Sequence, residues 1–223
     1  MGNRWRPEGD QVQPKDFTIN AINQPVSNSP KVAVVYHSGY GHTKKQAEAV
    51  AAGAASVAGA KVALIPVEEA EARAEELNAA DAIIFGAPTY MGGVSAQFKT
   101  FMDWSSKVWF TQGWKDKLAA GFTNSGSLSG DKLNSLIDLS VFAAQQSMIW
   151  VSLGLMPGNN SSKGSADDLN RLGSYLGATA QSNVDEGPEK GPIASDLRIA
   201  EHLGQRVAEL ARIHAAAKVA VPA

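Results

Sequence analysis

Short apolar runs alternate with stretches of helical periodicity over most of this sequence, and this alternation is the feature that most constrains its fold. The runs are KVAVVY (31–36), KVALIP (61–66), DAIIFG (81–86), LAAGFT (118–123) and SMIWVS (147–152). Apolar runs without polar alternation are typical of strands in a parallel sheet that is covered on both faces. The sequence therefore predicts a doubly wound α/β fold, with a five-stranded parallel sheet in the order 2-1-3-4-5 and helices on both faces.

The predicted helices lie between and after these runs, at residues 43–58, 68–78, 94–104, 131–145 and 195–216. Thr43 is the expected N-cap of the first helix. Asp131 is expected as a cap or first-turn acid of the fourth. Residues 153–192 are rich in Gly, Ser and Asn and too long for a plain connector, so we predict an elaborated functional loop there.

The length of 223 residues suits a single α/β domain, which we place at residues 31–217. Residues 1–30 are polar, contain four prolines and show no hydrophobic period, so we interpret them as an extended arm. Residues 218–223 are interpreted as a short C-terminal tail.

Composition excludes several classes of function. The formal net charge of −2 lacks the basic surplus expected of a nucleic-acid-binding protein. The absence of cysteine excludes disulfides and thiolate chemistry, and the four histidines lack metal-ligand spacing, so no metal is expected. We find neither a signal peptide nor an apolar run of membrane-spanning length, and we expect a cytoplasmic protein that does not bind membranes.

The loop HSGYGHT (37–43) joins the first predicted strand to the first predicted helix. It is neither a Walker A loop nor a full GxGxxG, because Lys44 stands where the third glycine would be. It nevertheless brings Ser38, Thr43 and several backbone N–H groups to a helix N-terminus, which suits one terminal phosphate. A glycine-rich turn without a ligand is the alternative for this loop taken alone.

Two further loops, APTYMGG (87–93) and NSGSLSG (124–130), leave predicted strands at the same edge of the sheet. In an open α/β sheet, ligands bind beyond the carboxyl ends of the strands. Gly92 and Gly93 allow the backbone to approach a planar ligand closely. One phosphate site beside two loops that can contact a ring predicts a mononucleotide with a large flat head.

Four segments together resemble a known family. They are SGYGHT, DAIIFGAPTYMGGVSAQFKTFMD, TNSGSLSG and PIASDLRIAEHLGQRVAEL, and they are similar to the flavodoxin-like NAD(P)H:quinone oxidoreductases of the WrbA type, within the NADPH-dependent FMN reductases. The most specific part is the stretch from Phe85 to Asp103. The resemblance spans about residues 31–215 and implies a flavodoxin-like fold.

The resemblance also implies FMN as cofactor, NAD(P)H as co-substrate and a quinone as electron acceptor. By position, the FMN phosphate would contact Ser38, Gly39, Tyr40, Gly41, His42 and Thr43. The flavin ring would be flanked by Pro88, Thr89, Tyr90, Met91 and Gly92. The polar edge of the ring and the ribityl chain of FMN would contact Asn124, Ser125, Gly126, Ser127, Leu128 and Ser129. Trp109 and Gln145 would line the substrate pocket, with Gln145 bordering the flavin. A homo-dimer or homo-tetramer is expected, assembled through the flavin-binding side.

The sequence departs from the family pattern at three places. Gln145 and Gln146 replace two histidines that relatives often carry, and Tyr90 stands where an arginine is frequent. The segment between the second and third predicted strands is shorter than in many relatives. We predict an enzyme that passes two electrons from NAD(P)H to quinones by a ping-pong mechanism, with no side chain assigned a certain catalytic role. The alternative is a flavodoxin-type electron carrier without a small-molecule substrate.

Overall fold

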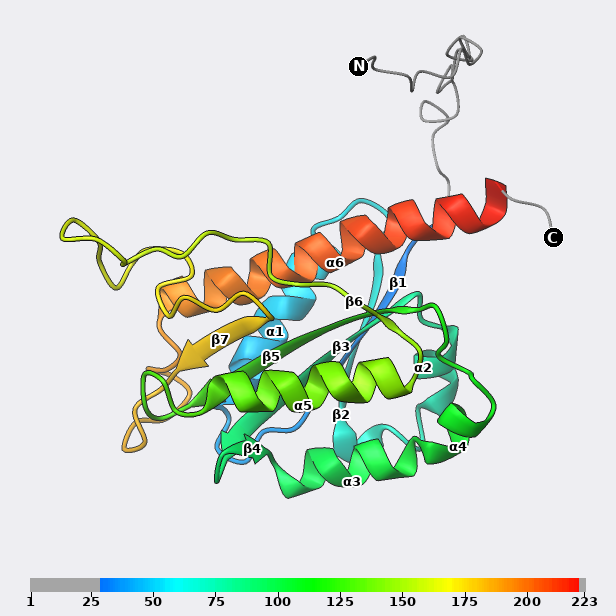
Figure 1. Ribbon diagram of the computed structural model, residues 1–223, viewed down its shortest axis with the longest axis horizontal. Coiled ribbons are helices and arrows are strands. Elements are labelled where there is room, and N and C mark those ends of the chain that lie inside the picture. Colours follow the sequence, from blue (N-terminus) through cyan, green and yellow to red (C-terminus); the bar gives the residue numbers. More distant parts are fainter. Residues whose placement is uncertain (1–28, 221–223) are drawn as a thin grey trace, which may run out of the picture.

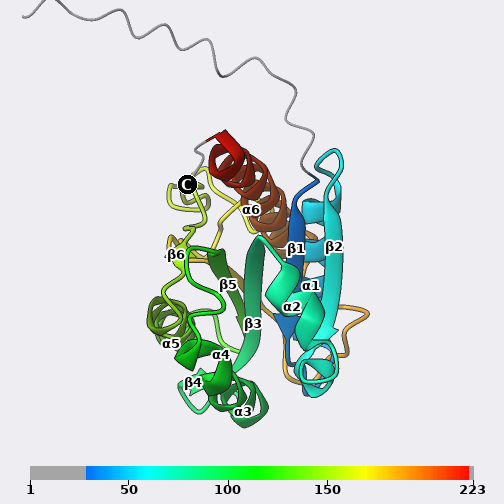
Figure 2. The same ribbon diagram turned by 90° about the vertical axis from the view of Figure 1, so that its right-hand side faces the viewer.

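The computed structural model describes residues 29–220, with side chains described to residue 217. Its parallel sheet has the order β2-β1-β3-β5-β6 (Figures 1 and 2), from Lys61–Pro66, Lys31–Tyr36, Ala82–Tyr90, Leu118–Ser125 and Ile149–Trp150. Each predicted run overlaps one of these strands, although β3 and β5 extend beyond their runs to Tyr90 and Ser125, and the predicted order 2-1-3-4-5 is confirmed. A two-residue strand, β4 (Gly93–Val94), pairs antiparallel with the end of β3.

Helices cover both faces of the sheet (Figure 2). On one face lie α1 (His42–Ala55) and α6 (Ala194–Ala220), and on the other lie α3 (Ala96–Trp104) and α5 (Lys132–Gln145). Two cores follow from the alternation of side chains along β1, because Val32 and Val34 pack toward α1 and α6 while Ala33 and Val35 pack toward α3 and α5. The predicted doubly wound fold is confirmed.

The edge beyond β5 differs from the prediction. Only Ile149–Trp150 of the fifth predicted run forms a strand, β6, which pairs with Leu118 and Ala119. A further strand, β7 (Ala178–Gln181), lies within the segment predicted as loop and pairs in parallel with Phe122–Ser125. The fifth strand position is thus occupied by two short strands, and the chain between them extends beyond the sheet (yellow in Figure 1).

Two local predictions about helix ends were wrong. The first helix begins at His42, and its N-cap is Gly41 in the left-handed conformation (φ 90°) rather than Thr43. The turn before the helix is held in this path because the hydroxyl of Ser38 accepts hydrogen bonds from the N–H groups of Gly41 and Lys44, at 3.1 Å each. The predicted acidic helix 68–78 is divided into a 3-10 turn, η1 (Val67–Glu69), and α2 (Ala74–Ala79).

The remaining elements are close to their predicted positions. Asp131 is the N-cap residue of α5, although its side chain makes no capping hydrogen bond. A short helix, α4 (Ser106–Phe110), follows α3. Helix α6 continues to Ala220, three residues into the stretch interpreted as a tail. The predicted arm, apart from its last two residues, lies outside the described residues.

Candidate functional site

The three loops that follow β1, β3 and β5 meet in one cavity of about 570 Å³, here called the carboxyl-edge cavity. Its lining includes Ser38, Tyr40, His42, Thr43, Pro88, Thr89, Tyr90, Met91, Asn124, Ser125 and Gly126. The loops converge because parallel neighbouring strands place their carboxyl ends along the same edge of the sheet. Most of the predicted site residues are therefore adjacent in space.

The first loop places the N-terminus of α1 at the cavity. Thr43 lies in the first turn, is buried, lines the cavity, and its hydroxyl makes no hydrogen bond to the described part of the chain. Ser38 holds the turn together through its bonds to the N–H groups of Gly41 and Lys44. Hydroxyls, exposed N–H groups and the positive end of a helix dipole together suit a phosphate group.

Two tyrosines form an aromatic wall of this cavity. The rings of Tyr40 and Tyr90 meet edge to face, with their centroids 6.3 Å apart. A Cβ built on Gly39 would lie 2.6 Å from the hydroxyl oxygen of Tyr90, so only glycine allows that ring to lie so close to the first loop. Burial raises the pKa of Tyr90, nearby Tyr40 raises it further, and a backbone hydrogen bond with Gly39 opposes both. Met91 is fully exposed beside them.

The far side of the cavity rests on a network of buried hydroxyls. The Thr89 hydroxyl lies 2.8 Å from that of Thr123 and 2.7 Å from that of Ser135, which ties β3 to β5 and α5. Among the described residues that line the cavity, none is Lys, Arg, Asp or Glu. Any ligand there would meet hydrogen-bonding groups and aromatic surface rather than formal charges.

Sequence reasoning missed a fourth loop, residues 182–190, which follows β7. Ser182 and Val184 line the carboxyl-edge cavity, and Asn124 Nδ2 donates to Ser182 Oγ at 2.9 Å. His42 Nε2 donates to the backbone oxygen of Glu186 at 2.9 Å, which fixes this loop against the start of α1. The only signal in the sequence was the unusual length of the segment 153–192, because β7 itself carries no long apolar run.

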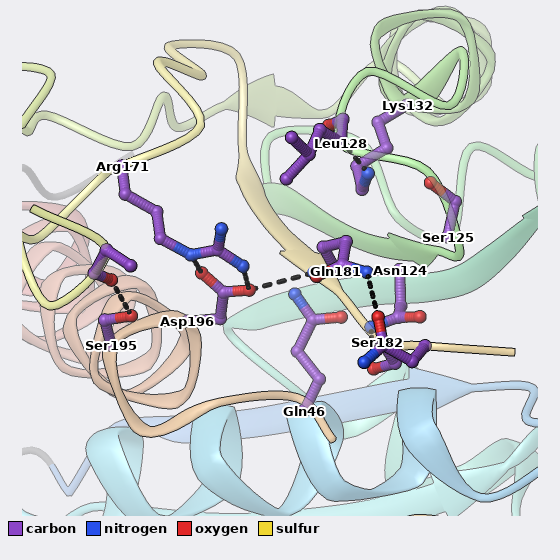
Figure 3. Close-up of polar contacts among 12 residues, drawn as sticks. Gln46, Asn124, Ser125, Leu128, Lys132, Arg171, Gln181, Ser182, Ser195 and Asp196 are labelled. Carbon is purple, nitrogen blue, oxygen red and sulfur yellow. Dashed lines mark hydrogen bonds and ion pairs between the residues drawn. The ribbon is translucent and has the colours of Figure 1, made fainter. Parts of the chain in front are cut away.

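Part of the third loop turns away from the cavity. Ser127, Leu128 and Ser129 are absent from its lining, although they were predicted to contact the ribityl chain or ring. The buried amine of Lys132 donates to the carbonyl oxygens of Ser127 (2.6 Å) and Leu128 (3.1 Å) and so holds this part of the loop toward α5 (Figure 3). Leu128 and Ser129 instead line a different cavity.

Trp109 and Gln145 lie together in a third cavity of about 670 Å³, between α3, α4 and α5, here called the helix-side cavity. Within one chain, Gln145 does not line the carboxyl-edge cavity, where most of the other predicted flavin contacts lie. Gln145 ends α5, a 14-residue helix that begins at the carboxyl edge, so it lies about 20 Å along the helix from that edge. Trp109 and Gln145 share a pocket whose lining includes Gly93 of the second loop but no residue of the first or third loop.

The base of the first loop is held by His37. Its Nδ1 lies 2.8 Å from the hydroxyl of Ser95, the N-cap residue of α3. Burial lowers the pKa of His37, and Glu68 opposes this shift.

Within residues 29–217, no group of three or more His, Cys, Asp or Glu side chains is placed to hold a metal ion. No described helix is both long and apolar enough to cross a membrane.

The sheet is doubly wound in this strand order, and the loops after β1, β3 and β5 meet in one cavity at its carboxyl edge. These features define a flavodoxin-like mononucleotide-binding protein. A sequence profile described as NADPH-dependent FMN reductase matches residues 60–154. Flavodoxin FldP of Pseudomonas aeruginosa is 45% identical over 190 residues, covering 83% of this chain and 99% of the relative.

Two further comparisons agree. An NAD(P)H dehydrogenase (quinone) of Archaeoglobus fulgidus is 36% identical over 204 residues, covering 81% of this chain and 97% of the relative. The crystal structure of a flavodoxin, WrbA-like protein from Agrobacterium tumefaciens superposes with a TM-score of 0.66 at 44% identity, covering 83% of this chain and 99% of the other. The chain belongs to the WrbA-type flavodoxin-like family.

Proposed function

We propose that this protein is an FMN-dependent NAD(P)H:quinone oxidoreductase, with FMN bound in the carboxyl-edge cavity. The observation that carries this proposal is the meeting of the loops after β1, β3 and β5 around one cavity of about 570 Å³, which is a suitable size for a mononucleotide. The family profile and the quinone dehydrogenase relative support the choice of reaction.

The residues present fit the phosphate of FMN. The free hydroxyl of buried Thr43 faces the cavity from the first turn of α1, and Gly41 has the left-handed backbone that opens this turn. We assign contacts with the phosphate to Ser38, Gly39, Tyr40, Gly41, His42 and Thr43. Contacts with the flavin ring are assigned to Pro88, Thr89, Tyr90, Met91 and Gly92. Contacts with the other polar groups of FMN are assigned to Asn124, Ser125 and Gly126. Ser182 and Val184 join this set from the fourth loop.

When bound, FMN supplies reversible two-electron chemistry, and the protein positions it and shields it. Tyr90 and Tyr40 form an aromatic wall on which planar groups can stack. The exposed side chains of Tyr40 and Met91 leave that side open to solvent. We propose that NAD(P)H and the quinone use this open side in turn, which is a ping-pong order.

Flavin binding provides the first test. The purified protein should bind FMN, and the variants Ser38→Ala and Thr43→Val should each weaken FMN at least about tenfold, as expected when a charge-assisted hydrogen bond of about 1.5–3 kcal/mol is lost. Riboflavin, which lacks the phosphate, is the matched control, and its affinity should be nearly unchanged in both variants. A protein that binds neither flavin would refute the proposal.

A flavodoxin-type electron carrier is the second candidate, because the relative at 45% identity is named a flavodoxin. The two functions differ in turnover. An oxidoreductase should oxidise NADH or NADPH with benzoquinone at a steady rate, and double-reciprocal plots at several quinone concentrations should be parallel for a ping-pong order. A carrier should bind FMN equally well and show almost no turnover with these substrates.

We also propose that the protein is a cytoplasmic homo-dimer or homo-tetramer. Leu133, Ile137 and Val141 follow one another at four-residue spacing on α5 and are each more than 40% exposed. Such an apolar stripe is typical of a subunit interface. Assembly would also allow Trp109 and Gln145 of one copy to approach the cavity of another. Sedimentation of wild type and Ile137→Glu tests this, since the variant should dissociate to monomers.

A further inference from the structure

A second cavity, of about 720 Å³, lies where the fifth strand position is interrupted, and we call it the strand-gap cavity. Strand β5 pairs with β6 at Leu118–Ala119 and with β7 from Phe122 onward, so the sheet edge changes partner between them. Residues 172–176 of the long loop form one wall of the cavity, and residues 128–133 at the start of α5 form another. The interruption of the strand therefore creates this cavity.

The positive charge in this cavity belongs to Lys132, whose side chain is only 3% exposed. Its Nζ donates to the carbonyl oxygens of Ser127 and Leu128. An ammonium group has three N–H donors, and no third acceptor for Lys132 lies among the described residues. Burial is the main cause that lowers the pKa of Lys132 to about 8, so the amine is charged at neutral pH.

Two neighbouring charges act on this ammonium in opposite senses, because Asp196 raises the pKa of Lys132 and Arg171 lowers it. Arg171 and Asp196 lie close by, but they form a bidentate pair with each other at 2.8 and 2.7 Å (Figure 3). Asp196 also accepts the backbone N–H of Gln181. Asp196 is not part of the cavity lining. The acid that does line the cavity is Asp131, and its side chain is exposed.

A second polar group in this cavity has no partner. Thr179 on β7 lines the cavity and is 5% exposed, yet its hydroxyl makes no hydrogen bond within the described part of the chain. It is paired in register with Thr123, so both side chains lie on the α5 face of the sheet. The hydroxyl is not among the fully buried side-chain atoms that lack a partner, so it is open to the cavity and is a donor available to a ligand there.

We propose that the strand-gap cavity binds a small aromatic carboxylate, with the carboxylate on Lys132 and Thr179 and the ring against Tyr175 and Leu176. Two unused donors on neighbouring walls match the two oxygens of a carboxylate. Leucine and tyrosine side chains supply most of the remaining lining, which suits an apolar ring. A single ammonium beside Asp131 favours a singly charged group over a phosphate.

This site is separate from the carboxyl-edge cavity, because the two linings share no residue. The inference therefore does not depend on flavin binding. Lys132 connects them indirectly, since it holds the third loop through Ser127 and Leu128. Occupation of the strand-gap cavity should not displace FMN.

The test is calorimetric titration of the full chain with 1-naphthoate, and with neutral 1-naphthalenemethanol as the matched ligand. Naphthoate should bind at least ten times more tightly than the alcohol. Lys132→Met and Thr179→Val should each weaken naphthoate at least about fivefold. The control variant is Lys99→Met, which removes a lysine from the helix-side cavity and should leave naphthoate affinity unchanged. Circular dichroism establishes that each variant is folded.

Thr179→Val conserves shape and keeps the test valid if Lys132→Met does not fold. Tyr175→Ala, at a half-exposed side chain, should also weaken naphthoate. The proposal is overturned if wild type does not bind naphthoate, if Thr179→Val and Tyr175→Ala bind it as tightly as wild type, or if FMN competes with it. Competition by FMN would place naphthoate in the carboxyl-edge cavity instead.

Discussion

Pro188 lies directly against Gly41, although 146 residues separate them in the chain: a Cβ built on Gly41 would come within 2.8 Å of the Pro188 Cγ. Gly41 also has a left-handed backbone, with φ of 90°. The first loop and the fourth loop therefore touch at a glycine of the turn, where no side chain intervenes. This contact holds the fourth loop, which contributes Ser182 and Val184 to the carboxyl-edge cavity, against the start of α1.

We predict that Gly41→Ala destabilises the protein more than Gly92→Ala. Both glycines have φ near +90°, so both variants carry a left-handed backbone cost of about 1–2 kcal/mol. A Cβ on Gly92 meets nothing within 4 Å, whereas one on Gly41 meets Pro188, which adds about 1–3 kcal/mol of overpacking. Urea unfolding of the flavin-free protein measures the difference. Adding Pro188→Ala should recover stability only in the Gly41→Ala background, and equal recovery in both would contradict the explanation.

The ion pair of Arg171 and Asp196 should be important for stability. Both side chains are more than 90% buried, and the pair links the long loop to α6 and, through the Gln181 N–H, to β7. Arg171→Met leaves a buried carboxylate without its partner and should cost about 3–5 kcal/mol. Lys45→Met, which removes an exposed pair with Glu48, is the control and should hardly change the unfolding midpoint. Similar midpoints for the two variants would show that the buried pair is not an anchor.

Lys132 should make stability depend on alkaline pH. Its pKa falls from 10.5 to about 8 on folding, so between these values the unfolded chain binds more protons than the folded one. Stability therefore gains a contribution that increases with pH from about 8 to 10.5, and Lys132→Met lacks it. The free energy of unfolding should be measured against pH for both proteins. Across this pH window, the value for wild type should increase relative to the value for the variant. Parallel curves would contradict a lowered pKa.

Gln145→His should change quinone turnover more than FMN affinity. Gln145 lines the helix-side cavity and not the carboxyl-edge cavity, so FMN affinity should remain within about twofold of wild type. A histidine there adds a group that can carry a proton, and the change in turnover should follow its titration near pH 6.5. Flavin titration and steady-state assays of both proteins provide the measurements. Weaker FMN binding with unchanged turnover would be the opposite of this expectation.

Local pattern was sufficient to predict the sheet and most of the candidate site. The apolar runs at 31–36 and 61–66 match β1 and β2 residue for residue, because strands of a parallel sheet that is covered by helices carry apolar side chains at successive positions. The loops after β1, β3 and β5 could then be placed together, since parallel strand order alone determines which loops share an edge.

Long-range contacts determined what the sequence could not show. Strand β7 has the sequence ATAQ, which has no strand signal of its own, and it pairs with the carboxyl half of β5 on the side away from β3, where β6 does not reach. Its formation brings Ser182 and Val184 into the carboxyl-edge cavity and Thr179 opposite Lys132. Likewise, Gly41 rather than Thr43 is the N-cap residue of α1, with the turn held by the Ser38 hydroxyl, since the cap depends on the path of the turn.

The sequence by itself therefore determined the fold class, the strand order and the anion-binding turn, because each depends on apolar periodicity and residue types within one segment. Only the tertiary structure decided that Gln145 and Trp109 lie outside the carboxyl-edge cavity and that the ammonium of Lys132 is held beneath the third loop. These features depend on where a helix ends relative to the sheet and on which distant segments pack together.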